Sequence, residues 1–145
     1  MGIPERWGRS RPLPTDVEAR LARVPELCRR HGARLCYLFG SLASRAPRPR
    51  PAGDVDLAVL GGPDTDLWAL RLDLGDALGT ERIDVVDLAR ASEVTRFEII
   101  RTGRLLHAVD EASENAFELR TLAEYKDRAI PRRRRAQWLR ESLRR

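Results

Sequence analysis

The distribution of apolar and polar positions predicts a chain in which short strands alternate with helices. Apolar runs of strand length are bounded by Gly, Pro or Asp, whereas longer segments repeat an apolar residue every three or four positions. This alternation predicts a small α/β sheet with helices packed mainly on one face. Strands are expected at residues 35–39, 54–60, 81–88 and 104–109, and helices at residues 15–30, 67–78, 92–102, 111–130 and 132–145.

Capping and breaking residues mark the ends of these helices. Thr15 is expected to cap the first helix, in which Pro25 predicts a kink or two short helices. Asp64 or Asp66 is expected to cap the helix that Gly79 closes. In the long helix at residues 111–130, the apolar stripe is expected to consist of Leu119, Leu122, Ala123 and Ile130.

Acidic residues interrupt two of the predicted strands, where Asp is disfavoured. Asp54 and Asp56 are two positions apart and therefore project from the same side of their strand. A solvated strand end explains this pair as well, because an isolated Asp-x-Asp has little specificity. Asp84 adds a third carboxylate if its strand pairs with the second one. Asp87 points to the other face and is expected at the surface or in a turn.

Three carboxylates at one point repel each other unless a cation lies between them. Mg²⁺ binds carboxylate, water and phosphate oxygens, and two such ions form the arrangement that nucleotidyl transfer uses. We therefore expect Asp54, Asp56 and Asp84 to be catalytic residues that hold Mg²⁺, with two ions in the site.

A Gly-Ser pair directly follows the first predicted strand and precedes a short helical turn. Backbone N–H groups at such a position are able to bind an anion, because Gly40 lets a phosphate approach and the Ser41 hydroxyl adds a donor. A plain helix cap at Ser41 is the alternative, since Gly-Ser alone has almost no specificity.

Composition limits the class of protein. The 145 residues, with 42% apolar and 34% charged residues, predict one globular domain. The chain has no apolar run near the ~20 residues of a membrane span and begins without a secretory signal, so a cytoplasmic protein that does not enter the membrane is expected. Cys28 and Cys36 are expected to be buried free thiols, and His31 and His107 lack metal-ligand spacing.

Positive charge is concentrated at the C-terminus. The net charge is +5, and residues 131–145 hold seven Arg and one Glu, so the rest of the chain is close to neutral. A basic tail on a neutral body predicts docking to an acidic partner. A protein partner, a second copy of this chain and nucleic acid all stay open as that partner.

The order of these motifs resembles the nucleotidyltransferase superfamily of DNA polymerase beta. At this size the chain is most similar to the minimal nucleotidyltransferases (MNT), the antitoxins of HEPN/MNT toxin–antitoxin pairs. The resemblance covers about residues 16–125 and implies a mixed sheet with C-terminal helices. It rests on Phe39-Gly-Ser41, Gly53-Asp-Val-Asp-Leu-Ala-Val59, Ile83-Asp-Val-Val-Asp-Leu88, Arg96-Phe-Glu-Ile99 and Gly103-Arg-Leu-Leu106.

The resemblance implies an adenylyltransferase that uses ATP as its substrate and modifies a tyrosine of a cognate HEPN toxin. It assigns phosphate binding to Gly40 and Ser41, and Mg²⁺ binding to Asp54, Asp56 and Asp84. The sequence departs from the family pattern at Gly53, where Ser is usual, and after Arg45, where Gly is often found. Arg96 and Glu98 match a family motif for which the sequence provides no role beyond a helix-surface ion pair.

Two other functions are compatible with the residues. One is nucleotidyl transfer to a small molecule of the aminoglycoside type, and the other is a non-catalytic nucleic-acid-binding module that uses the Arg-rich tail. A small helical protein with an Arg-x4-His motif encoded beside this chain would favour the antitoxin. The expected organisation is a flexible segment at residues 1–14, a nucleotidyltransferase domain at residues 15–110 and a helical extension with a basic tail at residues 111–145.

Overall fold

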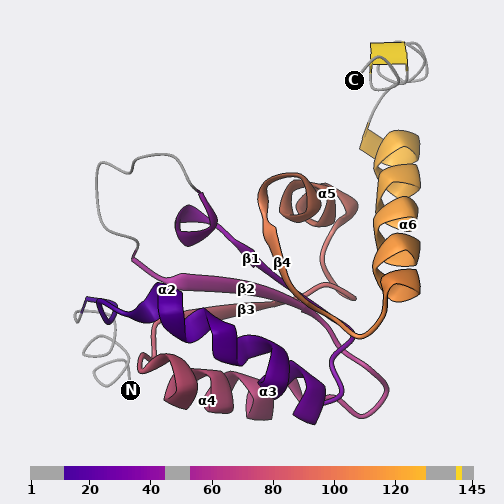
Figure 1. The fold of residues 1–145 in the computed structure, drawn as a ribbon. Coiled ribbons are helices and arrows are strands. Elements are labelled where there is room, and N and C mark those ends of the chain that lie inside the picture. Colours follow the sequence, from indigo (N-terminus) through magenta and orange to yellow (C-terminus); the bar gives the residue numbers. More distant parts are fainter. Residues whose placement is uncertain (1–11, 45–52, 130–139, 142–145) are drawn as a thin grey trace, which may run out of the picture.

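The structure is a computed structural model that describes residues 12–44, 53–129 and 140–141. These residues contain one four-stranded mixed sheet with the strand order β3-β2-β1-β4 (Figure 1). β1 pairs antiparallel with β2 and with β4, whereas β2 and β3 are parallel. The predicted strands are confirmed, with bounds that differ by up to two residues. They are β1 (Leu35–Phe39), β2 (Val55–Leu60), β3 (Ile83–Asp87) and β4 (Arg104–Ala108).

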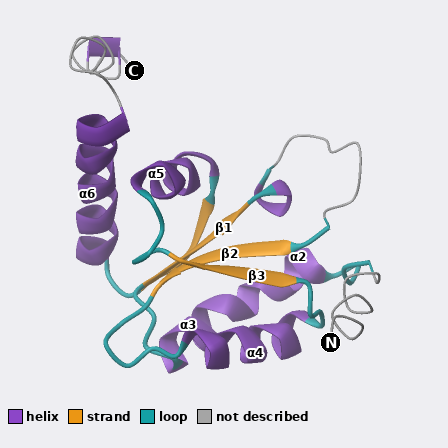
Figure 2. Ribbon diagram, turned by 180° about the vertical axis from the view of Figure 1, so that it is seen from behind, coloured by secondary structure: helices purple, strands orange, loops and turns teal. Residues whose placement is uncertain are grey.

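Three helices, α2 (Val17–Arg20), α3 (Val24–Arg30) and α4 (Leu67–Leu78), cover one face of the sheet (Figures 1 and 2). The predicted interruption near Pro25 is confirmed, because a single 3-10 turn at Leu21–Arg23 separates α2 from α3. Pro25 lies in the first turn of α3, where its missing N–H breaks no helical hydrogen bond. The predicted cap at Thr15 is wrong. Asp16 occupies the N-cap position of α2, and no side chain caps that helix.

The core on this face is built from alternate strand residues. Cys36 and Leu38 of β1 are fully buried there, together with Val55, Leu57 and Val59 of β2. Alternation places the intervening residues of each strand on the opposite face. The side chains of β2 that face away from this core therefore belong to the surface on which the acidic residues lie.

The opposite face is covered by α5 (Glu93–Thr102) and α6 (Glu111–Ala129), so the helices flank the sheet on both sides (Figure 2). Arg96 of α5 forms an ion pair with Glu124 of α6 at 3.0 Å. Phe97 stacks on Tyr125, with 4.0 Å between the ring centroids. This face has its own small core, formed by Leu35, Tyr37, Ala58, Leu88, Ile99 and Phe117.

The predicted apolar stripe of α6 is wrong in phase. Leu119 is 67% exposed, whereas Phe117 and Thr121, four residues apart, are the buried residues among positions 111–127 of this helix. The side of α6 that contacts α5 and the sheet therefore includes polar residues as well as Phe117. On this side, Glu124 forms the ion pair with Arg96, and Tyr125 stacks on Phe97. Ile130 lies outside the described residues.

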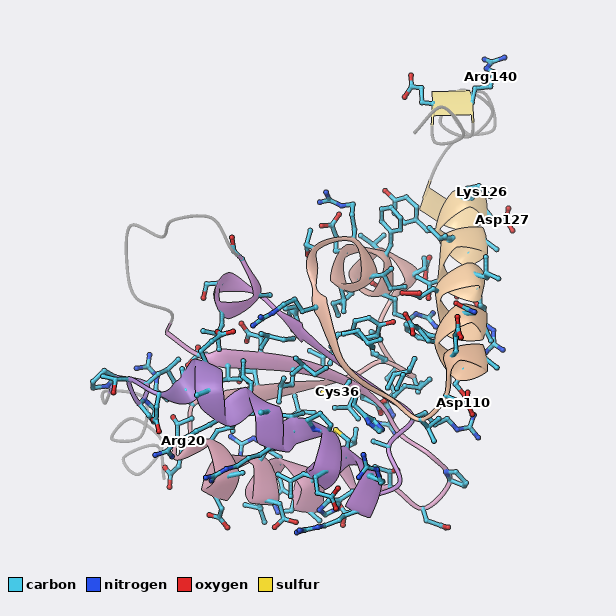
Figure 3. The ribbon with its side chains drawn as sticks, viewed as in Figure 1. Arg20, Cys36, Asp110, Lys126, Asp127 and Arg140 are labelled. Carbon is cyan, nitrogen blue, oxygen red and sulfur yellow. The ribbon has the colours of Figure 1, made fainter. Side chains whose placement is uncertain are left out.

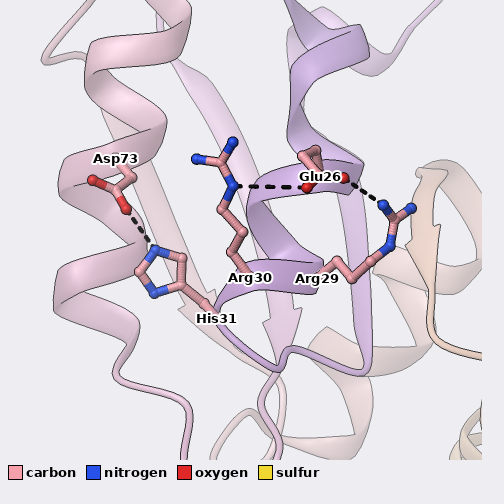
Figure 4. A network of polar contacts seen from close by, with 5 residues as sticks. All are labelled: Glu26, Arg29, Arg30, His31 and Asp73. Carbon is pink, nitrogen blue, oxygen red and sulfur yellow. Dashed lines mark hydrogen bonds and ion pairs between the residues drawn. The ribbon is translucent and has the colours of Figure 1, made fainter.

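The other helix ends agree with the sequence. The Asp66 side chain accepts hydrogen bonds from the backbone N–H groups of Trp68 (3.0 Å) and Ala69 (3.1 Å), so Asp66 rather than Asp64 caps α4. Gly79 closes α4 in the left-handed conformation, at φ 70°. His31 is the C-cap residue of α3, and its Nε2 lies 2.6 Å from a carboxylate oxygen of Asp73 in α4 (Figure 4). Glu26 pairs with Arg29 and, at 3.7 Å, with Arg30 on the same helix (Figure 4).

Both cysteines are buried and free, as predicted, and Cys36 lies inside the domain (Figure 3). His107 is buried in the edge strand β4, where its Nε2 lies 3.0 Å from the carbonyl oxygen of Ala33. Across the ranges that the structure describes, no helix has the length and apolar character needed to cross a membrane. The structure does not describe residues 1–11 and 45–52, nor the predicted basic helix at residues 132–145 except residues 140–141.

Candidate active site

Asp54 and Asp56 lie at the start of β2 on the side that faces away from the α2–α4 core. Val55, Leu57 and Val59 fill that core, and the alternation of the strand turns the two carboxylates to the other face. The same-side placement predicted from the spacing of the two residues is therefore confirmed. Asp54 immediately precedes the strand, and Asp56 is its second residue.

Asp84 is brought beside them by the pairing of β2 with β3. In the parallel register, Asp56 and Asp84 are direct partners across the two strands. Burial raises the pKa of the Asp56 carboxyl group, and the charges of Asp84 and Asp54 and a hydrogen bond with Asp84 raise that pKa further. The three carboxylates thus form one electrostatic cluster in which the ionised form of Asp56 is disfavoured.

The Gly40 backbone forms one wall of this cluster. Gly40 follows β1, whose last residue, Phe39, is the cross-strand partner of Asp56. A Cβ atom at position 40 would lie 2.2 Å from Oδ2 of Asp56, and Gly40 has a φ of 73° that residues with side chains rarely adopt. Position 40 therefore requires glycine because of both its conformation and the adjacent carboxylate. Ser41 begins the short 3-10 helix Ser41–Ala43, which confirms the predicted helical turn.

Arg82 contacts the cluster, and the analysis of the sequence did not identify it. Its Nε donates a hydrogen bond to Oδ1 of Asp54 at 3.3 Å, and its side chain is only 17% exposed. The signal was present in the sequence, because Arg82 and Asp84 are two positions apart and share a face wherever the segment is extended. Among the described residues, the cluster therefore contains the three acidic side chains and the basic side chain of Arg82.

The chemistry of these donors fits Mg²⁺, which prefers carboxylate oxygens. Burial and the charges of Asp84 and Asp54 raise the pKa of Asp56, and a cation bound beside its carboxylate would favour the ionised form. Within residues 12–44, 53–129 and 140–141, however, no three His, Cys, Asp or Glu side chains are already gathered as a metal cage. The Asp54 carboxylate is instead paired with Arg82. Asp54, Asp56 and Asp84 are the residues of this cluster whose carboxylate oxygens could hold Mg²⁺.

Comparison with known proteins decides the family. The sequence model described as "Polymerase beta, Nucleotidyltransferase" matches residues 24–112, which include β1 to β4 and every residue of the cluster. The chain belongs to the polymerase beta nucleotidyltransferase family. No curated protein sequence matches it significantly.

Solved structures share the fold of this nucleotidyltransferase. A chain of the complex between the tri-AMPylated Shewanella oneidensis HEPN toxin and MNT antitoxin is 24% identical, with 88% of this chain and 98% of that chain covered and a TM-score of 0.59. A chain of a toxin–antitoxin structure with AMP-PNP is 27% identical, with coverage of 81% and 94% and a TM-score of 0.55. A chain of the MntA–HepT toxin–antitoxin structure is 24% identical, with coverage of 87% and 98% and a TM-score of 0.57.

Asp87 of the nucleotidyltransferase is the last residue of β3, and a turn begins directly after it. Its side chain accepts a hydrogen bond from the backbone N–H of Ala89 at 3.0 Å and lies 3.8 Å from Arg90. Its Cα partner in the register is Val59, at the other end of the β2–β3 pair from Asp56. Asp87 is therefore separate from the carboxylate cluster.

The two charged residues of the Arg96-Phe-Glu-Ile99 motif have structural partners. Glu98 pairs with Arg101 on the surface of α5 at 2.9 Å, which is the helix-surface ion pair expected as the alternative. Arg96 instead ties α5 to α6 through Glu124, with its side chain 18% exposed. Arg96 also lines a cavity of about 450 Å³ near Leu60, at the end of β2 opposite to the carboxylates.

Proposed function

We propose that this protein is a Mg²⁺-dependent adenylyltransferase that transfers AMP from ATP to a protein acceptor. The proposed acceptor is a tyrosine of a HEPN-type toxin, which makes this chain the antitoxin of the pair. The observation that carries the proposal is the grouping of Asp54, Asp56 and Asp84 at one end of two adjacent strands, beside Gly40.

The reaction forms a bond between the tyrosine hydroxyl oxygen and the α-phosphorus of ATP. The bond from that phosphorus to the oxygen that bridges to the β-phosphorus breaks, and pyrophosphate leaves. The hydroxyl proton passes to a carboxylate of the site. When bound, Mg²⁺ neutralises the triphosphate and makes the hydroxyl a better nucleophile. The protein contributes mainly by positioning the two reactants and by stabilising the charge that develops in the transition state.

Each residue of the site has a proposed role in that positioning. Asp54, Asp56 and Asp84 hold Mg²⁺, and the strands that carry them fix their separation more rigidly than loops would. Gly40 and Ser41 contact the phosphates, with Gly40 allowing close approach and Ser41 contributing its hydroxyl. Gly40 also leaves room for the Asp56 carboxylate, so the phosphate-binding turn and the metal-binding strand are coupled at this residue.

The choice of a protein acceptor is supported by the structures with the same fold. One of them is a complex of a tri-AMPylated HEPN toxin with an MNT antitoxin, and another is a toxin–antitoxin structure with AMP-PNP. We assign catalysis to residues 15–110 and partner docking to residues 111–145. Seven Arg in residues 131–145 supply charge that complements an acidic partner surface, either on the toxin or on a second copy of this chain.

The test is a transfer assay with α-labelled ATP and Mg²⁺, run on the full chain with and without the HEPN-domain protein encoded beside it. Label is expected on the partner, and mass spectrometry is expected to place AMP on a tyrosine. Asp56→Asn serves as the inactive control. Label that appears only when aminoglycosides are added would favour a small-molecule acceptor. Absence of transfer, combined with RNA binding that is lost when residues 131–145 are removed, would favour a nucleic-acid-binding module.

A further inference from the structure

We infer that Arg82 is the internal counter-ion of the carboxylate cluster: it pairs with Asp54 in the metal-free protein and competes with the divalent cation for that carboxylate. The inference rests on the proposed Mg²⁺ site and adds to it a residue that sets the affinity of the site for metal. Arg82 acts through Asp54 and is therefore a positioning residue.

The backbone of Arg82 is fixed by the sheet. Its carbonyl oxygen accepts a hydrogen bond from the N–H of Val55 at 2.8 Å, directly beside Asp54. Its side chain extends toward Asp54, and Nε donates a hydrogen bond to Oδ1 of Asp54 at 3.3 Å. A Cβ atom on Gly53 would lie 3.4 Å from a terminal nitrogen of Arg82. The guanidinium group therefore lies along residues 53 and 54, at the point where the acidic residues begin.

Arg82 is the more buried partner of this ion pair. The Arg82 side chain is 17% exposed, while that of Asp54 is 41% exposed. Salt and water screen a partly buried charge less than a fully exposed one. Burial and the charges of Asp84 and Asp54 raise the pKa of Asp56, and a guanidinium group beside Asp54 offsets part of the negative charge of this group.

The metal ion and the Arg82 guanidinium group compete for the carboxylate of Asp54. A guanidinium group and Mg²⁺ on the same carboxylate repel each other, and Mg²⁺ accepts only oxygen ligands at short distances. Closing the metal site therefore requires Asp54 to give up Arg82.

A second arginine on the same edge of the sheet provides a matched control. Arg71 of α4 donates to the carbonyl oxygens of Ile83 (3.2 Å) and Glu81 (3.4 Å), on either side of Arg82 in the sequence. Its polar contacts there are backbone carbonyls, so neutralising it removes a charge and two hydrogen bonds near the site without releasing Asp54.

The experiment measures Mn²⁺ binding by calorimetry, together with melting temperature, for wild type and Arg82→Gln, Arg82→Lys, Arg71→Gln and Asp56→Asn. Arg82→Gln is expected to bind Mn²⁺ about tenfold more tightly, equivalent to ~1.4 kcal/mol, and to melt at a lower temperature without metal. Saturating Mn²⁺ is expected to remove most of that difference in melting temperature. Arg82→Lys keeps the charge and is expected to bind Mn²⁺ as wild type does, and Arg71→Gln is expected to leave Mn²⁺ affinity unchanged.

Equal or weaker Mn²⁺ binding by Arg82→Gln overturns the inference while leaving the metal site intact. If Arg82→Gln does not fold, Arg82→Met is used as the charge-removing variant, and its comparison with Arg82→Lys decides the question in the same way. If wild type shows no Mn²⁺ binding that Asp56→Asn abolishes, the metal site is wrong. In that case both the proposed function and this inference fail.

Discussion

The carboxylate of Asp56 occupies the space that a side chain on Gly40 would need, with its Oδ2 2.2 Å from the position of a Cβ atom there. A residue of the turn after β1 and a residue of β2 are thus in direct contact at the centre of the acidic cluster. The structure of the site depends on this contact as well as on the three carboxylates.

Replacing Gly40 with Ala is expected to disable the site although every carboxylate stays in the sequence. The backbone conformation of Gly40, with φ 73° and ψ −159°, costs about 1–3 kcal/mol for a residue with a side chain. The new methyl group must also displace Asp56. Transfer activity should fall about a hundredfold or more. Gly32→Ala is the matched control, because Gly32 has φ 70° but a Cβ there would meet only Oγ1 of Thr65 at 3.7 Å. Equal loss of activity in both variants would mean that backbone strain alone is responsible.

Neutralising Asp56 is expected to separate activity from stability. Asp56→Asn removes a charge that burial and the charges of Asp84 and Asp54 disfavour, so the metal-free variant should melt at the same or a higher temperature than wild type. Nucleotidyl transfer should fall about a hundredfold or more, and Mg²⁺ should no longer raise the melting temperature. A structural carboxylate would behave in the opposite way, and a large drop in metal-free melting temperature would contradict the assignment.

The unfavourable ionisation of Asp56 in the folded protein also predicts how the stability of the metal-free protein changes with pH. The folded-state pKa of Asp56 is raised, so the folded protein holds this proton at pH values where the unfolded chain, with a pKa of about 3.9, has released it. At low pH, where Asp56 is protonated in both states, it does not lower the free energy of unfolding. As pH rises above the unfolded-state pKa, ionisation of Asp56 lowers the free energy of unfolding, and this loss reaches its full size above the folded-state pKa. Asp54, Asp84 and Arg82 are the charged groups around it.

Urea denaturation in EDTA, compared between wild type and Asp56→Asn from about pH 4 to about pH 7, measures that cost. The free energy of unfolding of wild type should fall relative to the variant as pH rises. Saturating Mg²⁺ should reverse the trend for wild type alone. A difference between the two proteins that does not depend on pH would show that the titration of Asp56 does not contribute.

Asp84 and Asp87 are expected to differ in function although they lie in the same strand. Asp84→Ala should remove transfer activity, because Asp84 is the strand partner of Asp56. Asp87→Ala should keep most of the activity and lose about 1 kcal/mol of stability, because it gives up the hydrogen bond to the N–H of Ala89. Rates and denaturation curves for the two variants check this, and the reverse pattern of activity would disprove the strand register.

The faces of the strands were predictable from the sequence because they depend only on a period of two. Asp54 and Asp56 share a side for that reason, and Asp84 joins them if β2 and β3 are neighbours. The parallel register that makes Asp56 and Asp84 direct partners is set by packing, through the α4 connection, and no local pattern encodes it. The contact between Gly40 and Asp56 likewise requires the antiparallel pairing of β1 with β2.

Helix faces were less predictable where polar residues are buried. α6 buries Phe117 and Thr121 and completes its contact with α5 through Glu124 and Tyr125, so a search for apolar residues selected the exposed Leu119 instead. Arg82 was not predicted for a related reason, because its role depends on a contact with Asp54, 28 positions away in the sequence. In both cases the deciding interaction is a pair between segments distant in sequence.

The buried thiols of Cys28 and Cys36 allow local unfolding of the wild-type protein to be measured by thiol labelling. The chain has two cysteines, and both are 0% exposed, one on α3 and the other on the neighbouring β1. A thiol reagent therefore reacts only when the layer between α3 and the sheet comes apart. The labelling rate, measured against reagent concentration, yields the free energy of that opening without an introduced probe. Cys36 and the carboxylates lie on opposite faces of one sheet, so slower labelling upon addition of a ligand would reveal how far the site stabilises the core behind it.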